Sequence, residues 1–151
     1  MLLQRLFIIG ISGLVGTLCR YGLSELVARR FGERFPVGTL IVNLVGCFLA
    51  GAFFYSLNER ALASELVRSA VMIGFLGGFT TFSAFALQSF NLGRDGQLSF
   101  ALLYVLLSNL IGFAFVWLGY TLSRLLSLIV QTFPKLSDML QSSCKSRRRR
   151  S

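Results

Sequence analysis

Four long apolar stretches constrain the fold of this chain more than any other feature. They cover residues 6–27, 37–57, 69–90 and 98–126. A helix needs about 20 mainly apolar residues to cross a bilayer, because the hydrocarbon layer is roughly 30 Å thick and a helix rises about 1.5 Å per residue. Each stretch is long enough, and a hydrophobic content of 54% exceeds what a soluble domain of 151 residues needs. We therefore expect an all-α integral membrane protein with four transmembrane helices.

The chain divides into two parts by composition. Residues 1–130 are expected to form the transmembrane domain and residues 131–151 a basic, disordered C-terminal tail. The last apolar stretch continues to Phe133 and is expected to stop at Pro134, because proline lacks the backbone N–H that a helix interior uses. The tail ends in four arginines at 147–150, for which we expect solvation or contact with lipid headgroups.

Charge and cysteine content exclude several classes of function. The net charge is +9, but six of the fifteen basic residues lie from Lys135 onward, so basicity does not indicate a nucleic-acid partner. The three cysteines are far apart and there is no histidine, so we expect neither a Cys/His metal site nor a structural disulfide. No nucleophile–base pair or phosphate-binding loop is recognisable, which argues against an enzyme.

Positive charge is balanced across the predicted membrane. With four spans both termini share one side, where Arg5, Arg60, Arg68 and Arg124 lie; the opposite side carries Arg29, Arg30, Arg34 and Arg94. Lysine and arginine near helix ends normally fix orientation, and an equal count removes that bias. One hypothesis is that copies insert in both orientations and pair antiparallel, with the basic tail as a counteracting bias.

The third apolar stretch has a composition that disfavours a continuous helix. Adjacent glycines, Gly77 and Gly78, precede the β-branched pair Thr80 and Thr81. Glycine and threonine are both poor helix formers, which predicts a break near the centre of this span. Irregular backbone at that depth is tolerated only inside protein or beside a wet cavity, where its free carbonyls can coordinate a cation.

Two of the polar residues in the other spans, Asn43 and Arg20, require a specific explanation for their place in lipid. Asn43 shares a helical stripe with Thr39, Gly46 and Ala50, and it either bonds to a neighbouring helix, for about 1 kcal/mol, or donates to an anion. Arg20 would cost about 2.5 kcal/mol or more at a helix centre unless it extends to the interface, so an anchoring and a functional role both remain open.

Three motifs together resemble the Fluc (CrcB) family of fluoride channels. They are the strings GTLCRY at 16–21, GTLIVNLVG at 38–46 and GFLGGFTTFSAF at 74–85, and the resemblance spans about residues 6–126. It implies a multi-pass protein of the cell inner or plasma membrane that passively exports fluoride and so limits its toxicity. It also implies an antiparallel, dual-topology homodimer in the lipid bilayer and a structural sodium ion that is not transported.

The resemblance also implies roles for individual residues. The fluoride pathway would include Asn43 as an amide donor, Phe82 and Phe85 as an aromatic pair, Ser83 as a polar neighbour, Arg20 near the vestibule and Tyr104 at a pore end. The backbone carbonyls of Gly77 and Thr80 would hold the sodium ion. Ala84 stands where the family often has threonine, which shortens a hydroxyl track, and Asn109 has no implied role.

Two other functions fit four short spans. A proton-coupled small multidrug-type exporter needs a carboxylate inside the membrane, and the best candidate, Glu25, lies at the end of the first stretch beside basic residues. In a membrane scaffold without transport, Arg20 would extend to the interface and the glycines would serve helix packing alone. The other interpretation of Phe82 and Phe85 is that they are ordinary lipid-facing or core aromatics.

Overall fold

A computed structural model describes the backbone of residues 2–32, 35–59 and 64–148, and the side chains of residues 2–32, 35–57 and 64–132. All regular structure in these ranges is helical. In chain order the elements are α1 Leu2–Phe31, α2 Val37–Phe53, the π-helix η1 Phe54–Glu59, α3 Glu65–Ser69, the π-helix η2 Ala70–Phe75, α4 Leu76–Phe79, α5 Phe82–Arg94 and α6 Leu98–Arg148.

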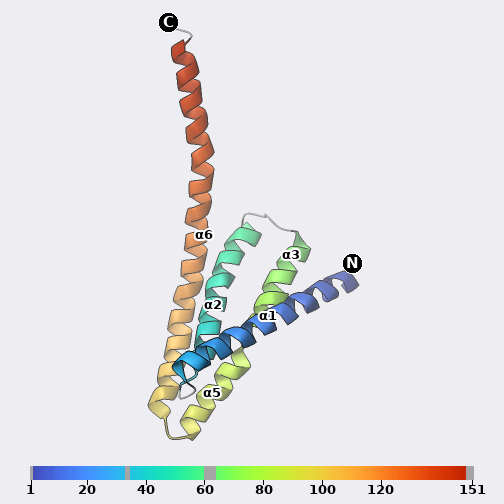
Figure 1. The fold of residues 1–151 in the computed structure, drawn as a ribbon, viewed down its shortest axis with the longest axis vertical. Coiled ribbons are helices and arrows are strands. Elements are labelled where there is room, and N and C mark those ends of the chain that lie inside the picture. The colour runs from blue at the N-terminus through green and yellow to red at the C-terminus, as the bar shows by residue number, and fades with distance from the viewer. Residues whose placement is uncertain (1, 33–34, 60–63, 149–151) are drawn as a thin grey trace.

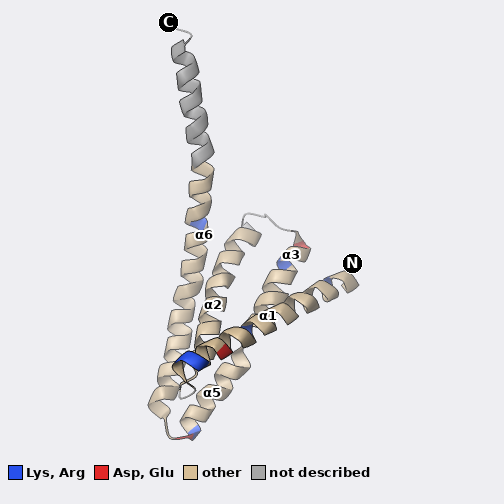
Figure 2. Cartoon of the chain, in the orientation of Figure 1, with Lys and Arg blue, Asp and Glu red and all other residues tan. Residues whose placement is uncertain are grey.

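Four segments are long and apolar enough to cross a membrane, which confirms the predicted four-span helical class. They are Leu2–Phe31, Val37–Leu57, Glu65–Arg94 and Leu98–Thr132. The helices are uncharged over most of their length, and α2 carries no charge at all (Figure 2). The third span is the composite one, since it contains α3, η2, α4 and α5.

The spans pack as two pairs of neighbours. α6 packs along α2, while α1 crosses the third span obliquely and contacts η2 and α4 (Figure 1). The α5–α6 turn and the start of α2 lie at the same end of the bundle, opposite the end where α2 is followed by η1. α6 extends well beyond the other helices at that second end.

The expected end of the last helix at Pro134 is wrong. The backbone of α6 continues through this proline as far as Arg148, and the tail that was expected to be disordered is helical up to that residue. One proline removes a single helical hydrogen bond, and the residues that follow are rich in leucine, methionine, glutamine, lysine and arginine, all good helix formers. The division of the chain after residue 130 stays a prediction.

Glycines set how closely the spans approach. A Cβ on Gly51 of α2 would collide with the carbonyl oxygen of Val116, and a Cβ on Gly119 of α6 would collide with that of Phe48. Likewise, a Cβ on Gly16 of α1 would collide with the carbonyl oxygen of Phe75. Close approach through small residues increases van der Waals contact, which is the main attraction between helices in lipid.

Replacing Gly119 by alanine should therefore destabilise the bundle, because α2 and α6 must move apart. The expected cost is about 1–3 kcal/mol, typical of overpacking. Gly22→Ala is the matched control, since a Cβ there meets nothing within 4 Å and alanine favours a helix. The measurement is the fraction of detergent-solubilised protein that stays monodisperse in gel filtration after heating. If Gly119→Ala and the parent protein lose half of their monodisperse fraction at the same temperature, this packing is contradicted.

Candidate functional site

The third span is interrupted between α4 and α5. α4 ends at Phe79, and the next two residues are extended, with φ −89° and ψ 159° at Thr80 and φ −149° and ψ 114° at Thr81. α5 then begins at Phe82. The interruption therefore lies close to the middle of the span Glu65–Arg94.

Threonine side chains stabilise both ends of this interruption locally. The Thr80 hydroxyl donates to the carbonyl oxygen of Leu76 at 2.9 Å, and the Thr81 hydroxyl accepts from the backbone N–H of Ala84 at 3.2 Å. The second bond is a helix N-cap, a position that threonine favours because its oxygen satisfies a free N–H of the first turn. The two threonines thus end one helix and begin the next.

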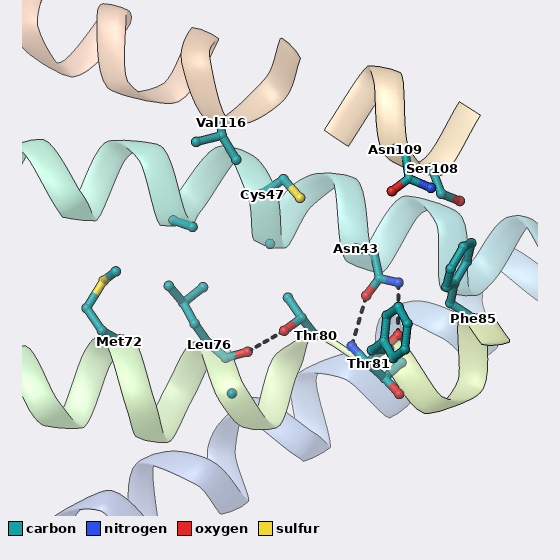
Figure 3. Close-up of a pocket in the computed structure, with 14 residues that line it drawn as sticks. Asn43, Cys47, Met72, Leu76, Thr80, Thr81, Phe85, Ser108, Asn109 and Val116 are labelled. Atoms are coloured by element: carbon teal, nitrogen blue, oxygen red, sulfur yellow. Dashed lines mark hydrogen bonds between the residues drawn. The ribbon is translucent and has the colours of Figure 1, made fainter. Parts of the chain in front are cut away.

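Asn43 of α2 completes the hydrogen bonding of the interruption. Its Nδ2 donates to the Thr81 carbonyl oxygen at 3.1 Å, and its Oδ1 accepts from the Thr81 N–H at 2.9 Å (Figure 3). One side-chain amide thereby satisfies both backbone groups of a residue that has left the helix. Unpaired backbone groups are costly in a bilayer, so this pair allows extended backbone at that depth.

The geometry supports the interhelical role for Asn43 directly. One of its two amide hydrogens is used by Thr81, which leaves the other for a ligand. Donation to an anion stays a prediction.

Beside the interruption lies a cavity of about 470 Å³ between α2, the third span and α6 (Figure 3). Its lining includes Asn43, Gly77, Thr80, Phe82, Phe85, Ser108 and Asn109. The Phe82 and Phe85 ring centroids are 5.7 Å apart, with the ring planes tilted by 48°. Phe82 is 80% exposed in the single chain, so one side of the cavity has no wall of its own.

Tyr104 lies behind Phe85. Its ring centroid is 5.3 Å from that of Phe85, and the side chain is completely buried. The Tyr104 hydroxyl donates to Gln88 Oε1 at 3.0 Å. Tyr104 therefore continues the aromatic series away from the cavity, toward the end of the bundle where α5 turns into α6.

The other two predicted pathway residues lie outside the cavity lining. Ser83 is exposed, with its hydroxyl 3.4 Å from that of Thr81. Arg20 is partly exposed on α1 and forms no ion pair with any residue of the described ranges. The structure thus brings together Asn43, Phe82 and Phe85, and the functional roles of all these residues stay predictions.

Two residues of α6 at the cavity carried no role in the sequence analysis. The Ser108 hydroxyl is buried and forms no hydrogen bond with the described part of the chain. Its position four residues after Tyr104 puts it on the same helical face, which is the signal that could have identified it. Asn109 is exposed, and its Nδ2 donates to the carbonyl oxygen of Val105 at 2.7 Å.

Comparison with known proteins defines the family of this chain. Residues 7–120 match the family described as CrcB-like protein, Camphor Resistance (CrcB). The chain belongs to this family. The matched range contains the interruption, Asn43, the aromatic series and Arg20.

Relatives of this CrcB-like chain match most of its length. A protein of Aquifex aeolicus named fluoride-specific ion channel FluC is 42% identical over 118 residues, which cover 78% of this chain and 95% of the relative. The protein of the same name from Geotalea daltonii is 43% identical over 122 residues, covering 81% and 98% respectively. One from Coxiella burnetii is 46% identical over 110 residues, covering 72% and 89%.

Replacing Asn43 by aspartate should loosen the interruption of this CrcB-like protein. Aspartate keeps the shape but places a carboxylate oxygen, which cannot donate when ionised, against the Thr81 carbonyl. Losing one such bond in a buried setting costs about 1–3 kcal/mol. We expect faster hydrogen exchange in peptides that cover residues 76–86.

Asn109→Ala is the control for this prediction, because within the described ranges the Asn109 amide donates to Val105 of its own helix and to no other helix. Unchanged exchange at 76–86 in the Asn43→Asp protein would show that the pair does not hold the interruption.

Proposed function

We propose that the chain is a fluoride-selective ion channel that passively exports fluoride across the cell membrane and so limits its toxicity. The observation that carries the proposal is one cavity where Asn43 and the Phe82–Phe85 pair meet at the interruption of the third span, in a chain whose relatives are named fluoride-specific ion channels. Family membership and the four spans make it a multi-pass membrane protein and not an enzyme, as predicted.

The chemistry of the cavity suits a small, strongly hydrated anion. Aromatic rings carry positive charge on their edges, and an amide N–H is a neutral donor. A conducting site must replace water without binding so tightly that the ion cannot leave, and weak donors in series meet that requirement. Among the described residues that line the cavity there is no carboxylate to oppose an anion.

The geometry does not favour the exporter alternative. Glu25, its candidate carboxylate, is exposed near the end of α1 and forms an ion pair with Arg29 at 3.1 Å. Glu25 does not belong to the lining of the cavity beside the interruption. A scaffold, in turn, has no use for polar groups directed into a cavity.

We propose that the channel is a homodimer whose two copies are antiparallel. The highly exposed Phe82 and the exposed Gly77 leave the cavity open on one side of the single chain, which a partner would cover. The balanced arginine count supports insertion in both orientations. Two pathways per dimer follow from this arrangement.

We further propose a structural sodium ion at the interruption, held by the backbone carbonyls of Gly77 and Thr80. The Thr81 N–H donates to Asn43, so the Gly77 carbonyl lacks the donor four residues later that a continuous helix would supply. Both residues line the same cavity, and carbonyl oxygens are hard ligands that suit a hard cation. When bound, the ion would supply positive charge close to the anion path.

The test of the channel function is efflux from liposomes loaded with potassium fluoride or potassium chloride and opened with valinomycin. We expect rapid loss of fluoride and negligible loss of chloride from the parent protein. Equal loss of both anions, or no fluoride loss from folded protein, would contradict the proposal and favour a nonselective pore or the scaffold.

Replacing Phe82 or Phe85 by isoleucine should lower the fluoride efflux rate at least tenfold, because isoleucine lacks the positive ring edge that an anion contacts. Tenfold corresponds to about 1.4 kcal/mol in a rate-limiting barrier. Phe90→Ile is the matched control, since Phe90 is on the same helix, is 65% exposed and does not line the cavity. If all three variants conduct alike, the aromatic pair has no role in the pathway.

The sodium proposal is tested by stability. Dialysed protein should keep its dimeric gel-filtration peak to a higher temperature in sodium chloride than in equimolar potassium chloride, because an ion that binds only the folded state stabilises it. Identical midpoints in the two salts would argue against a specific sodium site.

A further inference from the structure

A second cavity, of about 420 Å³, lies at the end of the bundle where the α1–α2 and α5–α6 connections meet. Its polar lining comes from all four spans or their ends. The residues are Ser24, Thr39, Gln88, Asn91, Asp95 and Gln97. Hydroxyl and amide side chains therefore make up most of the polar lining of this cavity.

One buried side chain separates this cavity from the first. The Tyr104 ring packs against Phe85, which lines the first cavity. The Tyr104 hydroxyl donates to Gln88 at 3.0 Å, and Gln88 lines the second cavity. An ion that leaves the aromatic pair on this side therefore meets Tyr104 and then the amide-lined cavity.

The amides of this cavity are free to contact a ligand. Gln88 Oε1 accepts from Tyr104, so the Gln88 Nε2 hydrogens remain available. Within the described ranges the side chains of Asn91 and Gln97 form no hydrogen bond. Three neutral donors beside a buried phenol give a setting in which an anion can exchange protein N–H groups for water.

A carboxylate in the same lining would oppose an anion if it acted alone. Asp95 lies at the cavity, with Oδ1 3.1 Å from Arg94 Nε. Both side chains are more than half exposed, so this pair contributes little to stability. The pair does matter for an anion in the cavity, because the positive charge of Arg94 cancels the repulsive field of the Asp95 carboxylate at the entrance.

We propose that this cavity is a mouth of the conduction path for small hydrated anions, with Gln88, Asn91 and Gln97 as donors, and that Arg94 neutralises Asp95 there. This inference rests on the proposed channel function and adds an electrostatic determinant of its rate. It predicts that anion flow depends on the balance between Arg94 and Asp95, more strongly in low salt.

The first experiment compares Arg94→Gln with the double variant Arg94→Gln/Asp95→Asn in fluoride efflux. At an ionic strength of about 10 mM, where the screening length is about 30 Å, the single variant should conduct at least about threefold more slowly, and the double variant should regain the parent rate. At about 1 M, where the length is about 3 Å, the difference should disappear.

Arg68→Gln is the matched control, because Arg68 pairs with Glu65 at 2.8 Å at the opposite end of the same span. It should conduct like the parent protein. An Arg94→Gln rate equal to the parent rate in low salt, or a double variant as slow as the single one, would overturn the proposal.

A second experiment tests the path itself on folded, conducting protein. In a background without Cys19, Cys47 and Cys144, Asn91→Cys should lose most of its fluoride efflux when a small neutral methanethiosulfonate modifies the thiol. Gly93→Cys is the control, since Gly93 lies two residues away, outside the lining, with nothing within 4 Å of its Cβ position. Full efflux from confirmed, modified Asn91→Cys protein would overturn the mouth alone, whereas absence of fluoride efflux from the parent protein would overturn the channel function and this inference together.

Discussion

The two hydrogen bonds between the Asn43 amide and the backbone of Thr81 are the interaction on which the site depends. They satisfy an N–H and a carbonyl that have left the helix in the middle of a membrane span, where no water replaces a missing partner. Without these two bonds, a continuous helix would be the more stable form of the third span, because it would satisfy the same backbone groups internally. The pair holds Thr81 extended, and Thr81 in turn caps the start of α5, the helix that carries Phe82 and Phe85.

The interruption also orders the polar and aromatic groups along the bundle. From the Asn43 cavity the series passes through Phe85 to Tyr104, and from the Tyr104 hydroxyl to the amides of the second cavity. Glycines make this compact arrangement possible, because the carbonyls of one helix touch the bare Cα atoms of the next at Gly16, Gly51 and Gly119. Glycines occupy the helix crossings, and bulky side chains such as Phe82 and Phe85 line the cavity instead.

Much of this architecture is predictable from the sequence because bilayer thickness fixes helix length, and composition alone locates the four spans. The glycine and threonine pairs mark the interruption, but they cannot reveal that Asn43 reaches Thr81, a contact between residues 38 positions apart. Ser108 was not predicted because its one signal, the position four residues after Tyr104 on the same helical face, is weak in an apolar helix. The predicted end of α6 at Pro134 was wrong, because one proline does not outweigh the favourable helix propensities of the residues that follow it.

We propose that this arrangement of Asn43 and the aromatic pair selects fluoride. The most direct measurement is the reversal potential of the current through the protein in a planar bilayer, with different fluoride concentrations on the two sides and chloride balancing the ionic strength. A fluoride-selective channel should give a reversal potential equal to the equilibrium potential of fluoride. Reversal at the equilibrium potential of chloride or of the cation would contradict it.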